Sequence, residues 1–598
     1  MDDEFRGLVD EAAVFASLDR AARALIAEQL TARSVTGGEV LIREGDEADA
    51  LFLIAEGRLR VIGRRDDGTP QTLAELGRGE IVGEMALVTN EPRSATVTAV
   101  RDSVVLELPA TTFLALVQEH PDVLREVTTK VVGRLMRSLR GGAPTSPVAT
   151  IAVVPLDEAP ELTGFGTDLA DAFGRLTGAV TKITRTAATD ALGDLEQVPG
   201  ARLTGWLAEQ ERGAEVLVLV AESTPGPWTD FCVRQADLIL FVAAARTASS
   251  PRPVEDYVTE RRAHVPARTQ LVLVHPATTP DPRGTRRWLT PRAVEQHHHV
   301  RSGRTADVDH VARLVLGRGV GLVFSGGGAR GVAGLGVLRA MRELDLPYDA
   351  VGGVSIGALV GGGAAREQSF EMLVDLLRDA VVTNSPFDVT FPAVSLAAGK
   401  RVTRHLQNAA DGLDMEDAWR PFFCVSTNLT RGRVEVHRTG PGWHAIRASF
   451  SIPGVFPPVR TPDGDLLVDG GVLDNLPVGV MRADHPGISV VSVDVRRARD
   501  LGGQGIPGDG VVSGWRVLLS RIDPSAREAD RAGLGRILLR LTEIGTDQGD
   551  RGDLCIRPAI ETFSIADFGA FDRLVDLGYQ AAMAALPPWR DEVLSGSS

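Results

Sequence analysis

The sequence predicts a multidomain fold, in which a small β-barrel-like domain with helices is followed by two α/β domains. A chain of 598 residues is too long to be organised around one hydrophobic core. Short apolar runs separated by turn residues fill the N-terminal part, whereas later runs alternate with helical stretches. We expect domains at residues 1–140, 148–315 and 316–598, a linker at 141–147, and a third-domain core at about 319–495.

The first domain is expected to consist of strands followed by helices. Between residues 36 and 108, apolar runs such as 51–54 and 59–62 are broken by Gly-Gly, Glu-Gly and Asp-Asp-Gly turns. From about residue 111 to 140 the apolar residues recur with a helical period instead. Residues 141–147 (GGAPTSP) then have the glycine and proline content that is typical of a linker.

The second domain is predicted to be built on a parallel sheet. Its expected buried strands are residues 150–154, 216–220, 238–242 and 270–275. Helical stretches lie between these runs, which is the pattern of an α/β domain. This domain has no GxxxxGK[ST] loop, so we expect no nucleoside triphosphatase activity there. The third domain opens with another expected strand at residues 320–324.

Composition and charge narrow the classes of function. The net charge of −15 argues against broad contact with nucleic acid. The three cysteines, Cys232, Cys424 and Cys555, lie far apart, so neither a disulfide framework nor a zinc site is expected. The N-terminus lacks a secretion signal, and no apolar run reaches about 18 residues. We therefore expect a cytoplasmic protein whose membrane contact, if any, is peripheral.

Two glycine-rich elements follow each other in the third domain. The first, GGGARG at residues 326–331, matches the GxGxxG pattern of dinucleotide-binding proteins. The next strand lacks the acidic residue that such a site needs. It ends instead in GVSIG at residues 353–357, a GxSxG nucleophile elbow centred on Ser355. Together the two elements predict a serine hydrolase, in which backbone N–H groups of the first loop stabilise the oxyanion.

A serine nucleophile needs a base, and Asp469 is the leading candidate. It follows an apolar strand and precedes two glycines, so its carboxylate is expected at a strand end. A Ser–His–Asp triad is the competing interpretation, because His485 follows Asp469 along the chain. His485 lies in a polar, loop-like segment, and we expect it on the surface. The apolar, proline-rich residues 448–459 are expected to line an acyl pocket.

The motifs GGGxRG, GxSxG, SIPGxFPP and DGG, in this order between about residues 320 and 494, resemble the patatin-like phospholipase family. The resemblance implies a patatin-like α/β hydrolase domain with a Ser–Asp dyad and no catalytic histidine. Ser355 would attack the ester carbonyl and Asp469 would take its proton. The residues that would line the oxyanion hole are Gly326, Gly327 and Gly328.

The first domain carries a second predicted site at residues 83–97 (GEMALVTNEPRSATV). A short helix after Gly83 offers N–H groups to an anion, and Arg93 can pair with a phosphate oxygen. Glu84 can accept a ribose hydroxyl, and Ser94 adds a hydroxyl donor. The segment resembles the phosphate-binding cassette of cyclic nucleotide-binding domains, which implies that these four residues contact cAMP or cGMP. A domain that has lost nucleotide binding is the alternative.

Two segments of the second domain resemble the region that precedes the catalytic domain in the neuropathy target esterase branch of the patatin-like family. They are residues 228–237 and 297–300. That branch is associated with lysophospholipid hydrolysis, which implies a phospholipid or lysophospholipid substrate. The three adjacent histidines of the second domain, at positions 297–299, would point in different directions, so we expect no metal site. The domain is expected to act as a structural or coupling module.

The leading hypothesis is therefore a lysophospholipase or carboxylesterase that forms an acyl-enzyme on Ser355, needs no catalytic cofactor, and responds to a cyclic nucleotide. Two alternatives stay open. One is a non-catalytic scaffold that senses nucleotide and lipid, and the other is an acyltransferase that uses the same dyad with an alcohol acceptor. Residues 384–400 are expected to form a mobile apolar loop.

Overall fold

The computed structural model describes residues 8, 9, 12, 15, 18–64, 70–89, 91–139, 150–198, 200–261, 268–384, 387–391, 393–496 and 549–595. The predicted linker lies outside these residues. By density of contacts the chain divides into two units. The first comprises residues 1–280, 287–318 and 485–487, and the second comprises residues 281–286, 319–484 and 488–598. No helix of the described ranges is both long and apolar enough to cross a bilayer.

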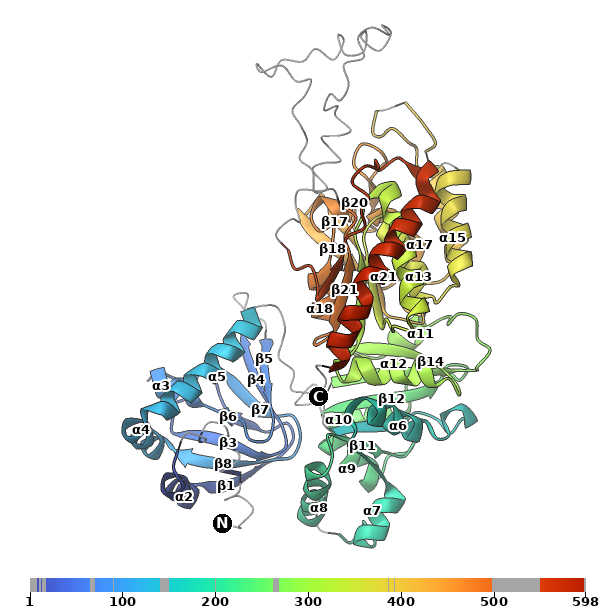
Figure 1. Cartoon of the computed structure of the whole chain (residues 1–598). Coiled ribbons are helices and arrows are strands. Elements are labelled where there is room, and N and C mark those ends of the chain that lie inside the picture. The colour runs from blue at the N-terminus through green and yellow to red at the C-terminus, as the bar shows by residue number, and fades with distance from the viewer. Residues whose placement is uncertain are drawn as a thin grey trace, which may run out of the picture. The chain divides into compact units, whose positions relative to one another are not determined.

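The N-terminal part contains two four-stranded antiparallel sheets and flanking helices, as predicted (Figure 1). One sheet has the order β1-β8-β3-β6 and comprises Thr31–Val35, Ser103–Pro109, Ala50–Glu56 and Ile81–Val82. The other has the order β2-β7-β4-β5 and comprises Val40–Ile42, Thr96–Ala99, Leu59–Arg64 and Pro70–Leu76. The helices are α2 (Arg20–Gln29), α3 (Glu84–Thr89), α4 (Ala110–Glu119) and α5 (Pro121–Leu139).

Successive side chains of β3 pack into two different apolar clusters, which shows why these strands form a barrel-like unit. Leu51 and Leu53 pack into one apolar cluster, whereas Phe52 and Ile54 pack into another. Successive side chains of a strand point to opposite faces, so β3 needs an apolar neighbour on both sides. Phe113 of α4 supplies part of one of them.

The middle part is an α/β domain with a six-stranded sheet in which every pairing is parallel. The order is β10-β11-β9-β12-β13-β14, formed by Val180–Thr184, Val216–Val220, Thr150–Pro155, Leu238–Ala244, Arg268–His275 and Gln296–Arg301. The helices are η2 (Pro160–Leu162), α6 (Phe165–Thr177), α7 (Arg185–Leu192), α8 (Gly200–Arg212), α9 (Pro227–Gln235), α10 (Pro253–Arg261), α11 (Arg286–Leu289) and α12 (Thr305–Val315). The four predicted strands are present, and β10 and β14 are additional.

The two additional strands escaped prediction because their sequences are polar. β14 contains the histidine run, and its side chains are bonded inside the domain. His299 Nδ1 lies 2.9 Å from His275 Nε2, and His298 Nε2 lies 2.9 Å from Gln270 Oε1. Among the described residues, no group of three or more histidine, cysteine or acidic side chains is arranged to hold a metal ion.

The C-terminal part is built on a mixed sheet in the order β19-β20-β17-β16-β15-β21-β22, with β18 paired to β17. Its strands are β15 (Val320–Phe324), β16 (Ala350–Gly353), β17 (Phe422–Asn428), β18 (Arg433–His437), β19 (Val459–Arg460), β20 (Leu466–Asp469), β21 (Ser489–Val493) and β22 (Leu554–Ile556). Its α-helices are α13 (Ala333–Glu343), α14 (Ile356–Ala365), α15 (Phe370–Arg378), α16 (Lys400–Ala410), α17 (Gly442–Ser449), α18 (Val478–Asp484) and α21 (Phe571–Ser595). Shorter helical turns are η3 (Gly328–Val332), η4 (Asp379–Thr383), η5 (Met415–Asp417), η6 (Gly470–Val472) and η8 (Phe568–Ala570).

The C-terminal residues complete this domain beyond the expected core at 319–495. Strand β22 pairs in parallel with β21, and α21 lies against α13 (Figure 1). The two helices approach so closely that a Cβ on Gly336 would lie 2.0 Å from the Val575 carbonyl oxygen. A Cβ on Gly578 would lie equally close to the Ala333 carbonyl oxygen. Glycine at both positions therefore permits the contact that closes one face of the sheet.

Candidate active site and nucleotide cassette

The nucleophile elbow is a strained turn between β16 and α14. Ser355 has φ 55° and ψ −125°, a conformation that costs a non-glycine residue about 1–3 kcal/mol. The flanking glycines have no room for a side chain. A Cβ on Gly353 would lie 2.4 Å from the Gly357 carbonyl oxygen, and a Cβ on Gly357 would lie 2.6 Å from the Phe324 carbonyl oxygen. The GxSxG spacing is therefore what allows the turn to present the serine.

Strand register brings Asp469 to the same level as Ser355. Along β17, Cys424 pairs with Gly353 of β16, and Ser426 pairs with Asp469 of β20. Ser355 lies two residues beyond Gly353, just as Ser426 lies two residues beyond Cys424. The nucleophile and the aspartate thus flank β17 at one level. The Ser355 hydroxyl acts on the Asp469 carboxylate as a hydrogen-bond donor does, lowering its pKa.

The environment of Asp469 suits a proton acceptor. Its carboxylate is buried, and this burial raises its pKa from 3.8 to about 6. Hydrogen bonds from the Ser355 hydroxyl and, at 2.8 Å, from the Gly471 N–H act in the opposite direction. The group is therefore mostly ionised at pH 7, while its proton affinity remains close to the working pH. That is the range in which a general base is most effective.

Two serines that the sequence analysis did not single out hold the backbone of the dyad. Ser449 Oγ accepts a hydrogen bond of 2.9 Å from the Ser355 N–H. The Ser451 carbonyl oxygen accepts one of 2.9 Å from the Asp469 N–H. Both serines lie in or next to the SIPGVFPP stretch, whose Phe456 is buried and stacks on Phe387. The stretch therefore supports the dyad, and its expected part in an acyl pocket stays a prediction.

The glycine-rich loop lies directly against the nucleophile. A Cβ on Gly326 would lie 3.1 Å from the Ser355 Cβ. The Gly326 N–H donates to Asn475 Oδ1 at 3.0 Å, and Asn475 Nδ2 donates back to the Gly326 carbonyl at 3.4 Å. Asn475 is buried and was not predicted, because no local pattern marks a partner 149 residues away. Since the Gly326 N–H has this partner, Gly327 and Gly328 are the better candidates for oxyanion donors.

The histidines of the competing triad have other partners. His485, expected on the surface, is only 9% exposed, and its Nδ1 lies 3.3 Å from Gln296 Nε2. The expectation of a surface residue was wrong because its segment lies at the end of α18 rather than in an open loop. His437 Nε2 lies 2.8 Å from Ser426 Oγ, and burial lowers the pKa of His437 to about 4.

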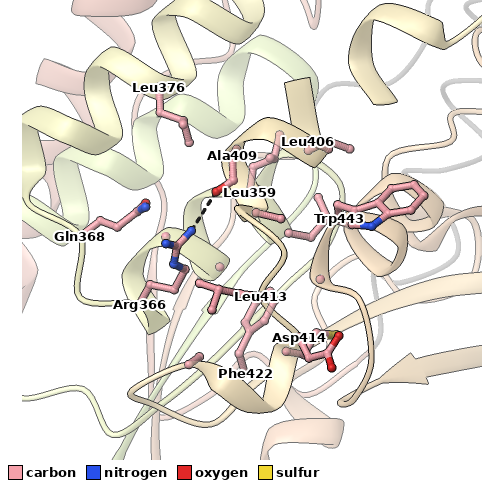
Figure 2. Close-up of a pocket in the computed structure, with 17 residues that line it drawn as sticks. Leu359, Arg366, Gln368, Leu376, Leu406, Ala409, Leu413, Asp414, Phe422 and Trp443 are labelled. Atoms are coloured by element: carbon pink, nitrogen blue, oxygen red, sulfur yellow. Dashed lines mark hydrogen bonds between the residues drawn. The ribbon is translucent and has the colours of Figure 1, made fainter. Parts of the chain in front are cut away.

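An apolar cavity of about 70 Å³ lies beside α14 (Figure 2). Leu359, Leu413 and Phe422 line it, and Arg366 donates to the Ala409 carbonyl oxygen at 2.8 Å (Figure 2). Its lining residues do not include Ser355 or Asp469. A volume of this size holds only a few water molecules or methylene groups, so the cavity is not a site for a long acyl chain by itself.

The predicted nucleotide cassette is assembled around Arg93. Its Nη1 donates to the Gly83 carbonyl oxygen at 2.9 Å, and its Nη2 donates to Ala50 O at 2.8 Å and to Asp49 Oδ1 at 3.0 Å. Gly83 has φ 90°, and a Cβ there would lie 2.6 Å from Arg93 Nη1. Glu84, which is buried, begins α3, whereas Ser94 is exposed. Asp49 was not predicted, and its side chain is 81% exposed.

Comparison with family models identifies all three parts of the chain. Residues 322–482 match the model described as patatin-like phospholipase. Residues 147–315 match the neuropathy target esterase family P-loop like domain, and residues 32–120 match the cyclic nucleotide-binding domain. The chain thus carries a patatin-like phospholipase domain behind a cyclic nucleotide-binding domain. The resemblance to the neuropathy target esterase branch of the patatin-like family is thereby confirmed.

Curated relatives match almost the whole chain. "Patatin-like phospholipase domain-containing protein 7" from Rattus norvegicus is 30% identical over 93% of this chain and 45% of its own length. "Lysophospholipase NTE1" from Mycosarcoma maydis is 32% identical over 94% of this chain and 34% of its own length. The human "Patatin-like phospholipase domain-containing protein 6" is 30% identical over 93% of this chain and 44% of its own length. The chain therefore spans less than half the length of these relatives.

Proposed function

We propose that the chain is a serine hydrolase that cleaves acyl esters of phospholipids or lysophospholipids. The observation that carries this proposal is the strand register that sets Ser355, at a nucleophile elbow, level with a buried carboxylate whose pKa is about 6. The name of the Mycosarcoma maydis relative, lysophospholipase, supports the substrate class.

The dyad residues account for both half-reactions. Ser355 Oγ attacks the ester carbonyl carbon while Asp469 takes the hydroxyl proton. The N–H groups of Gly327 and Gly328 stabilise the oxyanion, and Gly326 lines the same hole. The tetrahedral intermediate expels the alcohol, which takes the proton from Asp469 and leaves an acyl group on Ser355. Asp469 then deprotonates a water that attacks this ester, so that fatty acid leaves and Ser355 regains its proton.

The hairpin that is closed by the antiparallel bridge between Val389 and Ala397 exposes apolar side chains that fit peripheral contact with lipid. Val389 and Phe391 are each 84% exposed, and Val394 is 73% exposed. The base of the hairpin is firmly held, since Asp388 accepts hydrogen bonds of 2.8 Å from the N–H groups of Gly399 and Lys400. Apolar side chains this exposed are costly in water and are typical of surfaces that contact lipid or protein. The expected mobility of residues 384–400 stays a prediction.

Vesicle binding tests the role of the hairpin. The Phe391→Ser variant should bind phosphatidylcholine vesicles more weakly than wild type in a flotation assay. Met372→Ser, which removes a 55% exposed apolar side chain from α15, is the matched control and should bind as wild type does. Equal binding by all three proteins would argue against the hairpin.

The cassette supports a cyclic nucleotide, cAMP or cGMP, as an allosteric ligand. The phosphate would bind at Arg93 and the first turn of α3, and Glu84 would accept a ribose hydroxyl. Regulation requires that the nucleotide bind the active and inactive arrangements with different affinities. Arg93→Ala should abolish cAMP and cGMP binding in calorimetry, whereas Arg64→Ala, at an exposed position of β4, should not. Absence of binding to wild type would favour a domain that has lost its ligand.

One experiment tests the hydrolase and its regulation together. Fatty-acid release from lysophosphatidylcholine is measured for wild type, Ser355→Ala and Asp469→Asn, each with and without cAMP. We expect release by wild type alone. If wild type releases nothing and a fluorophosphonate probe does not label it, a non-catalytic scaffold becomes the better interpretation. If acyl groups appear on an added lysolipid instead of as free acid, the chain is an acyltransferase.

A further inference from the structure

An open groove of about 460 Å³ lies between α16 and α17. Its charged and polar lining includes Lys400, Thr403, Arg404, His444 and Arg447. None of its lining residues is an aspartate or a glutamate. The groove therefore concentrates positive charge in a chain whose net charge is −15. It is separate from the apolar cavity of Figure 2, although Trp443 lines both.

Arg447 is the unusual member of this groove. It is only 4% exposed, and it donates to Thr403 Oγ1, to Ser451 Oγ and, at 3.4 Å, to the Pro457 carbonyl oxygen. These acceptors are all neutral. Among the described residues no carboxylate lies within 4.0 Å of its guanidinium. A buried cation without an ion partner is rare, because removing the charge from water is costly.

Two other buried arginines of the same domain each form an ion pair with a carboxylate. Arg420 pairs with Glu367 at 2.6 Å, and Arg496 pairs with Asp494 at 2.8 Å. The nearest acid that acts on Arg447 is Asp388. Its carboxylate already accepts hydrogen bonds from three consecutive backbone N–H groups, those of residues 399–401. The positive charge of Arg447 is therefore left to face the groove.

The pKa shifts of Arg447 and His444 agree with a positive charge in the groove that no acid among the described side chains neutralises. Burial lowers the pKa of Arg447 to about 10, and the charge of Asp388 opposes this shift. Burial and the charge of Arg447 together lower the pKa of His444. An anion placed in the groove would reverse both effects. Gly399 leaves room for the guanidinium, because a Cβ there would lie 2.6 Å from Arg447 Nη2.

We infer that this groove binds the phosphate of a lysophospholipid headgroup, with Arg447 as the buried anchor and Lys400 and Arg404 as its exposed partners. The inference rests on the proposed lipid substrate. Guanidinium and ammonium groups are the usual partners of phosphate oxygens. Arg447 lies two residues before Ser449, which holds the Ser355 N–H, and it donates to Ser451, which holds the Asp469 backbone. A phosphate bound here would thus fix the substrate beside the dyad.

Binding is tested first, without turnover. Full-length Ser355→Ala protein is titrated calorimetrically with glycerophosphocholine and, separately, with inorganic phosphate. Adding Lys400→Ala and Arg404→Ala should weaken glycerophosphocholine binding at least tenfold. Arg401→Ala is the matched control, since Arg401 is an exposed cation of the same helix that does not line the groove. Binding of inorganic phosphate alone, or an equal loss with Arg401→Ala, would overturn the inference.

Kinetics then separates headgroup recognition from catalysis. With lysophosphatidylcholine, Lys400→Ala/Arg404→Ala should raise KM about tenfold and leave kcat nearly unchanged. With a monoacylglycerol of the same acyl chain, which has no phosphate, neither constant should change. An equal rise in KM for both substrates would contradict a phosphate site. Arg447→Lys keeps the positive charge but loses the paired N–H donors of the guanidinium. Its preference for lysophosphatidylcholine over the monoacylglycerol should be intermediate between those of wild type and Arg447→Met.

The two proposals fail in distinguishable ways. If wild type hydrolyses neither substrate, the proposed hydrolase fails, while the calorimetric arm still decides whether the groove takes a headgroup phosphate. If wild type hydrolyses both substrates and glycerophosphocholine does not bind, the hydrolase stands and the groove is not a headgroup site. A thermal melt of each Arg447 variant shows whether it is folded before its kinetics is interpreted.

Discussion

In both the proposed dyad site and the nucleotide cassette, a glycine-rich turn precedes a helix. The two sites differ in how far hydrogen bonds compensate the buried charged side chain. In the cassette, the Arg93 guanidinium donates to three oxygens, of Gly83, Ala50 and Asp49, so most of its burial is compensated. In the dyad site, Asp469 accepts from Ser355 and Gly471, and burial still raises its pKa to about 6. Incomplete compensation is what raises the pKa of the aspartate toward the range that the proposed base needs.

The degree of compensation affects how each site can respond to a ligand or to pH. The Arg93 guanidinium can respond by exchanging partners, for example Asp49 for a phosphate. An under-compensated carboxylate can gain and lose a proton near neutral pH. The following predictions test that contrast, beginning with the largest expected effect.

Removing the nucleophile should have the largest effect. Ser355→Ala is expected to lower kcat for lysophosphatidylcholine by about 10⁴-fold or more, because no acyl-enzyme can form. Ser355→Gly should be equally inactive but should melt at a higher temperature than Ser355→Ala. Glycine relieves the positive φ of 55° that alanine retains. Substantial activity in either variant would mean that another residue is the nucleophile.

Removing the charge of Asp469 should reduce activity and increase stability. Asp469→Asn is expected to lower kcat by about 10³-fold, since the base is lost. The rise in pKa from 3.8 to about 6 means that ionised Asp469 destabilises the fold by roughly 3 kcal/mol above pH 6. This penalty disappears as the pH falls toward 3.8, because the native state then binds the proton. The variant should therefore melt above wild type at pH 7.5, with a smaller difference at pH 4.5.

Asn475 should matter through its hold on the glycine-rich loop. Asn475→Ala removes both hydrogen bonds to Gly326 and should lower kcat about 10- to 100-fold with little change in KM. Asn475→Asp, which keeps the acceptor for the Gly326 N–H, should recover part of the rate. If Asn475→Ala lowered kcat and the affinity for a headgroup analogue by the same factor, the substitution would have disrupted the domain generally.

The pH profile of wild type should show the titration of Asp469 directly. Because the base must be ionised, kcat/KM should fall below pH 6 and be about tenfold lower at pH 5 than at its plateau. His437, whose pKa is lowered to about 4, should not contribute in this range. A midpoint near pH 7 would instead favour a histidine base.

The smallest effect is expected in the cassette. Asp49→Asn weakens the competition for Arg93 and should tighten cAMP binding about threefold, as expected for an ion pair whose acid is exposed. Glu44→Gln, at an acidic residue that pairs with Arg64 instead, is the matched control. Basal hydrolysis should be the same in both variants. Weaker cAMP binding by Asp49→Asn would mean that Asp49 orients Arg93 rather than competing for it.

Features that depend on local backbone geometry could be predicted from the sequence. GxSxG at 353–357 predicted the elbow, because only glycine fits where a Cβ would meet a carbonyl oxygen at 2.4 Å. Apolar runs predicted β15, β16 and β20 to within a residue or two, and the two cassette residues Gly83 and Arg93 lie in contact. Strand β14 was missed because its histidines bond to β13 instead of forming an apolar run, and β10 was missed because its sequence VTKIT has only two apolar residues.

Tertiary structure alone decided which distant side chains meet and what burial does to them. The register of β17 puts Asp469 level with Ser355, and Asn475 reaches Gly326 across 149 residues. Neither contact has a local signal, because pairing between separate strands depends on the whole sheet. The pKa of Asp469 and the unpaired charge of Arg447 likewise follow from the surroundings of each group. Residue type supplies the chemistry, but the dielectric and the neighbours that tune it are assembled only when the chain folds.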